Sequence, residues 1–251
     1  MRLHRRRDGW RGVRGRPRAD FESLTLTLPP SRRRLSAEVE ASLIAAFAAA
    51  APDAEPYRHW FVSEVFPADT ARALRHLPFP SPELGGVSGK RELHNDKRHY
   101  FDAANNARFE ACGAVADAFQ SRAVVGAIER TTGADLAGSY VRLEYAQDTD
   151  GFWLEPHTDL GVKLFTMLIY LPDSGEQNDL GTDIYADAAT WAKRPPFADN
   201  SALVFVPGAN TWHGLARRPI AGVRKSVIMN YVTDDWRARE QLAYPETPVR
   251  P

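Results

Sequence analysis

Residues 139–172, SYVRLEYAQDTDGFWLEPHTDLGVKLFTMLIYLP, contain two runs rich in β-branched and aromatic residues on either side of a polar loop. Short runs of this composition are typical of strands. Three more follow, TDIYAD, SALVFVPG and RKSVIMNYV, separated by glycine, proline, aspartate and asparagine. Because no long helical pattern lies between the runs, the sequence predicts an antiparallel sandwich or barrel in this half of the chain.

The chain before this region has helical patterns instead. The segment LSAEVEASLIAAFAAAAP (35–52) reads as a helix, with Ser36 as its candidate N-cap and Pro52 as its candidate stop. Residues 68–77 and 106–131 are also predicted to be helical. We therefore expect an α+β protein in which an N-terminal helical layer packs against a β core.

The beginning of the chain differs in charge from the rest. Residues 1–34 carry eleven arginines and three acidic residues, a net charge of +8, whereas the whole chain sums to zero. Without apolar periodicity, residues 1–35 are predicted to form a disordered, solvated tail. Weak nonspecific contact with nucleic acid or an anionic membrane, or a targeting role, are the alternatives. Residues 36–251 are predicted to form a single domain, with helical support at 36–135 and the β core at 136–235.

Composition limits the class of protein. The chain has 251 residues, of which 43% are hydrophobic and 25% charged, as in ordinary globular proteins. Its one cysteine, Cys112, excludes an internal disulfide and predicts a reducing compartment, the cytoplasm. We interpret Cys112 as a small buried hydrophobic residue of a helix rather than as a nucleophile. No apolar run is long enough to span a membrane.

Three polar side chains near the ends of predicted strands suggest a metal site. His157 and Asp159 follow the first strand across a loop, and His213 ends a later one. A His-x-Asp by itself is more often ordinary loop composition than a metal site. In an extended segment, however, residues 157 and 159 project to the same side. Two imidazoles and one carboxylate suit Fe(II) and similar divalent ions, and they leave coordination positions open for catalysis.

Arg224 and Ser226 begin the last long strand and share one face of it. An arginine on the inner face of a barrel is costly unless it meets an anion. Together the two side chains suit a carboxylate ligand that enters the barrel. The alternative for Arg224 is one half of a buried ion pair.

These motifs together resemble those of a known family. HTD at 157–159, His213 and RKS at 224–226 resemble the HxD…H…RxS pattern of Fe(II)/2-oxoglutarate-dependent oxygenases, in their prolyl-4-hydroxylase-like branch. FTMLIYLP, DLGTDIY and SALVFVPGANTWHG resemble further strands of that family, so the likeness covers most of 138–235. The resemblance implies a double-stranded β-helix, the jelly roll of cupin-like proteins. One departure is the turn at 180–183, which has one glycine where two are usual.

The resemblance also implies roles for individual residues. His157, Asp159 and His213 would ligate Fe(II), and Arg224 with Ser226 would bind the far carboxylate of 2-oxoglutarate. The carboxylate of Asp159 stands where halogenating relatives have a small residue, which favours hydroxylation. O2 would be the oxidant, and ascorbate a further reductant.

Two tyrosines, two tryptophans and one arginine near these motifs also have predicted positions. By the resemblance, Tyr170 and Tyr145 would contact the cosubstrate. Trp153 and Trp212 either line the substrate pocket or only pack, and Arg142 is expected on the outer face of its strand.

The segment ELHNDKRHYFD holds a cluster of polar side chains: His94, Lys97, Arg98 and His99. This cluster is either a solvated loop or a lid that grips an anionic or polar substrate.

The reaction that the resemblance implies is hydroxylation of a small molecule, with conversion of 2-oxoglutarate into succinate and CO2. Hydroxylation of a protein or peptide side chain is the first alternative. A non-oxidative cupin-like metal enzyme, or a binding protein that retains the metal, are alternatives of another class. Arg224 and Ser226 favour an oxygenase, because without a dicarboxylate cosubstrate they would lack a partner. The sequence does not specify an oligomeric state.

Overall fold

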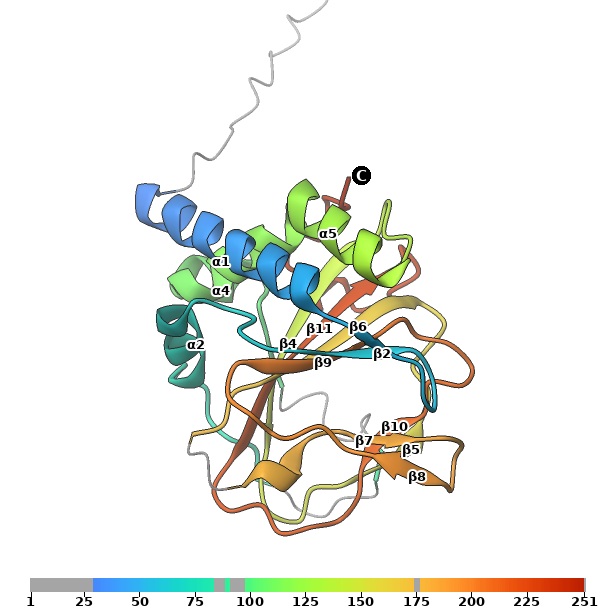
Figure 1. Cartoon of the computed structure of the whole chain (residues 1–251). Helices are drawn as coiled ribbons and strands as arrows, with labels where there is room; N and C mark the ends of the chain where they lie inside the picture. Colours follow the sequence, from blue (N-terminus) through green and yellow to red (C-terminus); the bar gives the residue numbers. More distant parts are fainter. Residues whose placement is uncertain (1–28, 84–88, 91–97, 174–176, 251) are drawn as a thin grey trace, which may run out of the picture.

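Helices and two antiparallel sheets form three layers, with the larger sheet in the middle (Figure 1). The structure is a computed structural model, and it describes residues 29–83, 89–90, 98–173 and 177–250. The predicted α+β class, with N-terminal helices packed on an antiparallel β core, is confirmed.

The larger sheet has seven strands, and the smaller sheet has four. Every strand pairs with its neighbours in antiparallel fashion. In spatial order the larger sheet consists of β1 (Pro52–Asp53), β2 (His59–Val62), β9 (Ser201–Phe205), β6 (Lys163–Tyr170), β11 (Arg224–Val232), β4 (Tyr140–Asp148) and β3 (His99–Tyr100). The smaller sheet consists of β5 (Leu154–His157), β10 (His213–Leu215), β7 (Asp183–Tyr185) and β8 (Trp191–Lys193).

Among the described residues, the α-helices come before the long strands in the sequence, and two short 3-10 helices, Asn178–Leu180 and Arg239–Gln241, come later. The α-helices are α1 (Pro30–Ala49), α2 (Ala68–Arg75), α3 (Ala103–Arg108), α4 (Glu110–Gln120) and α5 (Arg122–Thr132). Helices α1, α4 and α5 cover one face of the larger sheet (Figure 1). Gly133 follows the last residue of α5 and has the left-handed conformation that closes many helices (φ 79°).

Helix α1 begins earlier than predicted. Its first residue is Pro30, so Ser36 is not an N-cap and residues 30–35 belong to the helix rather than to the tail. A proline is well suited to the first turn because it has no N–H to leave unpaired. The guanidinium of Arg32 also holds this turn against α4, with Nε 2.7 Å and Nη2 2.9 Å from the carboxylate oxygens of Asp117. Residues 1–28 lie outside the described residues, and their predicted tail stays a prediction.

Alternation along the strands divides the larger sheet into two faces. The face toward the helices is an apolar core, which includes Val141, Leu143, Tyr145, Phe165, Met167, Ile169, Val227, Met229 and Tyr231. The opposite face turns toward the smaller sheet and contributes a second cluster, which includes Ala146, Leu168, Tyr170, Leu203, Phe205 and Ile228. The interior between the two sheets is where the polar motifs of the sequence meet.

Two further predictions can be compared with the structure. Cys112 is fully buried on α4, and burial raises the pKa of its thiol to about 12, so its interpretation as a small hydrophobic residue is confirmed. Among the described residues, no helix combines the length and the apolar character that crossing a membrane would require.

Candidate active site

The three predicted metal ligands meet between the sheets. His157 ends β5, Asp159 follows two residues later, and His213 begins β10. Strands β5 and β10 pair so that His213 lies opposite His157, and the two ring centroids are 4.3 Å apart. Candidate ligand atoms of all three residues lie within 4.8 Å of one another. Strand pairing therefore brings together ligands that lie 54 to 56 positions apart in the chain.

Backbone carbonyls fix the orientation of both imidazoles. Nδ1 of His157 lies 2.9 Å from the carbonyl oxygen of Glu155, and Nδ1 of His213 lies 3.0 Å from that of Thr211. A carbonyl only accepts, so each Nδ1 carries the proton in these contacts. Each Nε2 then keeps its lone pair, the arrangement that metal-binding histidines need.

The carboxylate of Asp159 is held ionised. The Thr166 hydroxyl donates to Oδ2 at 2.6 Å, and the Lys163 ammonium lies 2.5 Å from Oδ1. Burial alone would raise the pKa of Asp159, but the charge of Lys163 and the hydrogen bonds from Lys163 and Thr166 hold this pKa well below its ordinary value. Asp159 is therefore an anion at neutral pH.

His213 is held neutral. Burial lowers the pKa of its imidazole to about 4, although the nearby Asp159 carboxylate acts in the opposite direction. Neutral imidazoles and ionised carboxylates are the forms that ligate metals. The donor set of His157, Asp159 and His213 thus fits a divalent ion such as Fe(II) with open coordination positions.

A cavity of about 420 Å³ lies beside these ligands. Polar side chains make up much of its wall, including Lys90, Arg142, Glu144, Glu155, Lys163, Thr166 and Gln241, together with the apolar Leu154, Leu168, Ile228 and Trp236. This volume lies within the range of small-molecule sites.

A narrower cavity leads from the ligands toward Arg224. It has a volume of about 20 Å³ and shares Leu154, Leu168, His213 and Ile228 with the larger cavity. Its polar lining comes from Thr182, Arg224 and Ser226. A cavity of this size holds about one water molecule, so a larger ligand would have to displace its apolar walls.

Arg224 is one half of a buried ion pair, which was the alternative reading of its sequence position. Nη1 lies 2.7 Å from Oδ2 of Asp148, and Nε donates to the Leu180 carbonyl at 2.7 Å. Nη2 has only a 3.4 Å contact with the Thr182 hydroxyl. Ser226 is buried on the same face of β11, and its hydroxyl makes no hydrogen bond to the described residues. Donors of both side chains therefore remain available to a ligand.

The two predicted tyrosines lie on opposite faces of the larger sheet. Tyr170 lies inside, where its hydroxyl accepts from the Thr182 amide at 3.1 Å and its ring centroid is 5.9 Å from Cζ of Arg224. Tyr145 faces the helices and packs against Phe79. The prediction that Tyr145 contacts the cosubstrate is therefore withdrawn. The pairing of Arg224 with Asp148 puts even-numbered residues of β4 inside and odd-numbered residues outside.

The same register places Arg142 inside the barrel, so its predicted outer position is wrong. Arg142 lines the larger cavity and lies 2.6 Å from Glu144. Glu144 in turn lies 2.6 Å from Arg98, a residue just before β3. Sequence reasoning missed Glu144 and Asp148 as site residues. Charged residues two and four positions apart in an otherwise apolar run were the signal that could have revealed them.

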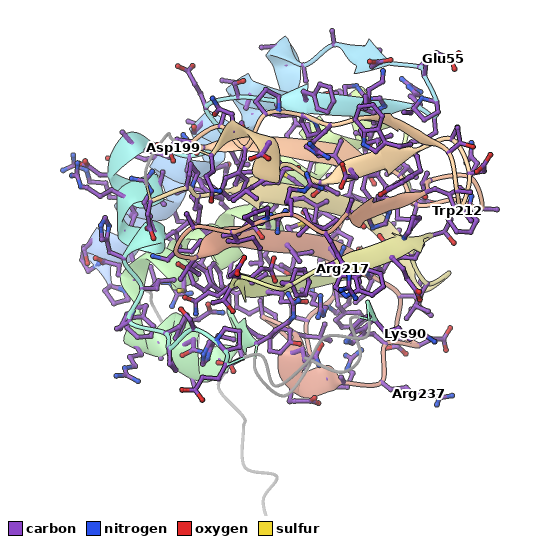
Figure 2. All side chains as sticks on the ribbon, turned by 90° about the horizontal axis from the view of Figure 1, so that it is seen from below. Glu55, Lys90, Asp199, Trp212, Arg217 and Arg237 are labelled. Carbon is purple, nitrogen blue, oxygen red and sulfur yellow. The ribbon has the colours of Figure 1, made fainter. Side chains whose placement is uncertain are left out.

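The remaining predicted residues have structural roles or lie outside the described part. Trp153 packs against Arg217, whose Cζ is 4.5 Å from its ring, and Trp212 lies at the edge of the molecule (Figure 2). Neither tryptophan lines the two cavities. Of the polar cluster, Arg98 is buried and His99 stacks on Phe79 at 4.3 Å, so these two are not part of a solvated loop. The other two members, His94 and Lys97, lie outside the described residues.

Comparison with known proteins identifies the fold. No protein-family model and no curated protein sequence matches the chain. Among solved structures, a prolyl hydroxylase from Trichoplax adhaerens, in complex with a hypoxia inducible factor peptide fragment, has a TM-score of 0.52 and 15% identity, over 83% of this chain and 93% of that one. A Pseudomonas putida prolyl-4-hydroxylase has a TM-score of 0.48 and 16% identity, over 78% and 94%. HygX from Streptomyces hygroscopicus, with nickel and 2-oxoglutarate bound, has a TM-score of 0.43 and 14% identity, over 70% and 81%. On the likeness to the first of these, the chain has the double-stranded β-helix fold of the 2-oxoglutarate oxygenases.

Proposed function

We propose that this protein is an Fe(II)- and 2-oxoglutarate-dependent dioxygenase that hydroxylates a small molecule. The observation that carries the proposal is the meeting of two motifs in one interior. His157, Asp159 and His213 surround one point, and a narrow cavity joins that point to Arg224 and Ser226. A metal site alone would suit many activities, but a buried cation and hydroxyl beside it suit a dicarboxylate cosubstrate.

Each part of the site has a role in this proposal. His157, Asp159 and His213 would hold Fe(II), which, with 2-oxoglutarate as electron donor, supplies the activation of O2. One oxygen atom would enter succinate as CO2 leaves, and the other would enter the product. Arg224 and Ser226 would bind the far carboxylate of the cosubstrate.

Other groups of the protein orient the candidate metal ligands. Lys163 and Thr166 keep the Asp159 carboxylate ionised and oriented, and carbonyls of the flanking backbone orient the two imidazoles. The Tyr170 hydroxyl lies beside Thr182, on the side of the barrel from which Arg224 projects. It can donate a hydrogen bond while it accepts one from the Thr182 amide. We keep Tyr170 as a proposed contact of the cosubstrate.

The size of the larger cavity favours a small molecule as the substrate. At about 420 Å³ it can enclose a metabolite-sized ligand. Its charged and polar walls favour a substrate that makes several hydrogen bonds. Hydroxylation of a peptide side chain is the second candidate, because the Trichoplax adhaerens prolyl hydroxylase was solved with a peptide fragment.

Anaerobic titration tests the core of the proposal. Fe(II) followed by 2-oxoglutarate is expected to give a visible metal-to-ligand charge-transfer band, and Arg224→Ala is expected to weaken the cosubstrate affinity. The control is Arg32→Ala, which removes an arginine that pairs with Asp117 in the helical layer. No band with the wild-type protein, or equal affinity in Arg224→Ala, would contradict an oxygenase and leave a non-oxidative metal enzyme.

A second experiment separates the kinds of substrate. Metabolites and peptides are screened for succinate formation, and products are examined for a gain of one oxygen atom. A small molecule that couples succinate to an oxygenated product supports the first candidate, and a peptide supports the second. Charge-transfer binding without turnover on any member of either set would favour a protein that only retains the metal.

A further inference from the structure

Five charged side chains form a buried chain of contacts along the inner face of β4. The contacts are Arg224 Nη1 to Asp148 Oδ2 at 2.7 Å, Asp148 Oδ1 to Arg98 Nη2 at 3.6 Å, Arg98 Nη1 to Glu144 Oε1 at 2.6 Å, and Glu144 Oε2 to Arg142 Nη2 at 2.6 Å. Between 2% and 7% of each side chain is exposed. Water therefore contributes little screening to any of them.

This buried set has one positive charge in excess. Among the described residues it contains three guanidinium groups and two carboxylates. Burial alone would lower the pKa of Arg98, but the charges of Glu144 and Asp148 raise it above its ordinary value, so Arg98 stays charged. A buried charge without a counter-ion is strongly unfavourable. The five described side chains can therefore take one more anion.

The contacts show where that anion can join. Both oxygens of Glu144 are engaged by arginines. Arg142 lines the larger cavity, but each of its guanidinium nitrogens already donates: Nε to Gln241, Nη1 to Asn230 and Nη2 to Glu144. Its guanidinium also lies between the rings of Tyr100 and Trp236, at 5.0 and 4.8 Å. Arg224, in contrast, lines the narrow cavity. Its Nη2 has only the 3.4 Å contact with Thr182, so the excess charge is accessible at Arg224.

Asp148 would neutralise the charge of Arg224 if it belonged to Arg224 alone. Its second oxygen, Oδ1, is buried and accepts no hydrogen bond within the described part of the chain, and it faces Arg98 at 3.6 Å. Arg98 thus shares the charge of Asp148 without touching the cavity.

We propose that Arg98 and Asp148 are positioning residues that set the charge which Arg224 presents to a dicarboxylate. Arg98 balances Asp148, and Arg224 is left with a positive charge for the far carboxylate of the cosubstrate. This inference rests on the proposed function. It extends the cosubstrate site to two residues that line neither of the two cavities beside the metal ligands.

The test compares two keto acids on the anaerobic, Fe(II)-loaded protein by calorimetry. 2-Oxoglutarate carries the far carboxylate, whereas 2-oxovalerate has the same chain length without it. Arg98→Met makes the buried set neutral, so the preference for 2-oxoglutarate over 2-oxovalerate is expected to fall by about tenfold or more. Asp148→Asn raises the excess to two charges and is expected to increase that preference.

The double variant Arg98→Met/Asp148→Asn restores an excess of one charge. Its preference is expected to return to within about threefold of the wild-type value. Loss of packing alone would weaken the binding of both keto acids. Adding Asp148→Asn would not restore that binding. The matched control is Arg32→Met, which removes another paired arginine with 14% of its side chain exposed, in the helical layer, and should leave the preference unchanged.

The outcomes separate this inference from the proposed function. If the wild-type protein binds 2-oxoglutarate but Arg98→Met keeps the wild-type preference, the inference is wrong and the function stands. If the wild-type protein does not bind 2-oxoglutarate with Fe(II), the function itself fails. If Arg98→Met does not fold, Asp148→Asn decides: an increased preference supports the inference, and an unchanged or decreased one overturns it.

Discussion

Leu143 and Glu144 are neighbours on β4, yet they lie in opposite environments. Leu143 is fully buried in the apolar core beneath the helices, and Glu144 is buried between two arginines on the inner face. The two faces of one sheet therefore have different roles. The helix side stabilises the fold through apolar burial. The inner side holds charges that are unfavourable unless each has its partner.

Of the substitutions on these two faces, Glu144→Gln is expected to lower the free energy of unfolding the most. The substitution leaves Arg98 and Arg142 without their shared carboxylate, and the free energy of unfolding should fall by about 3–5 kcal/mol. Urea denaturation measures the change, with the exposed Glu246→Gln as control. A loss below about 1 kcal/mol would show that the two arginines find other partners easily.

Leu143→Ala tests the other face. Loss of a fully buried leucine from the helix-side core should reduce the free energy of unfolding by about 2–5 kcal/mol. Because Leu143 points away from the metal ligands, Fe(II) affinity of the folded protein should equal that of the wild type. A weaker Fe(II) affinity in this variant would mean that the two faces are not independent.

Thr166→Val sharpens the comparison within the inner face. It removes the hydroxyl that donates to Asp159 at 2.6 Å, and Fe(II) affinity should fall by about 10–100-fold. Thr131→Val is the matched control, since the Thr131 hydroxyl donates to the Phe47 carbonyl in the helical layer. Equal metal affinity in the two variants would contradict an orienting role for Thr166.

Lys163→Met should change the metal affinity least of these substitutions at neutral pH, and more at acidic pH. The Lys163 ammonium helps to hold the pKa of Asp159 well below its ordinary value, whereas burial acts to raise it. Without Lys163 this pKa rises, so protons compete with the metal at higher pH than in the wild type. Co(II) affinity, measured as the pH falls from neutral toward about 4, the ordinary pKa of an aspartate, should therefore begin to fall at a higher pH than in the wild type.

The control for this measurement is Lys193→Met, which removes a lysine that pairs with Asp53. If Co(II) affinity begins to fall at the same pH in Lys163→Met and the wild type, Thr166 and the rest of the site suffice to keep Asp159 ionised.

Part of the candidate site could be predicted because its signals are local. His157 and Asp159 lie two residues apart, as do Arg224 and Ser226, and each pair shares a face in any extended segment. The predictions that failed depended on contacts between distant segments. Helix α1 begins at Pro30 rather than after Ser36, and Arg32 in its first turn pairs with Asp117, 85 positions away.

Local sequence likewise did not decide which face of β4 points into the barrel. By the resemblance, Tyr145 at the end of the strand before the metal loop was expected to contact the cosubstrate and therefore to face inward. The register opposite β11 puts Arg224 beside Asp148 and turns Tyr145 toward the helices. A shift of one residue would exchange the two faces of the strand, and burial across the whole sheet selects between them.

The sequence by itself predicted the strand-rich half of the chain from residue type. Short spacing paired His157 with Asp159 and Arg224 with Ser226, and the resemblance joined His213 to them as candidate site residues. Only the tertiary structure decided that His213 lies opposite His157, that Asp148 pairs with Arg224, and that Arg98 and Glu144 extend this pair into a buried network. The physical reason is that a buried charge takes its partner from whichever strand the pairing register places beside it.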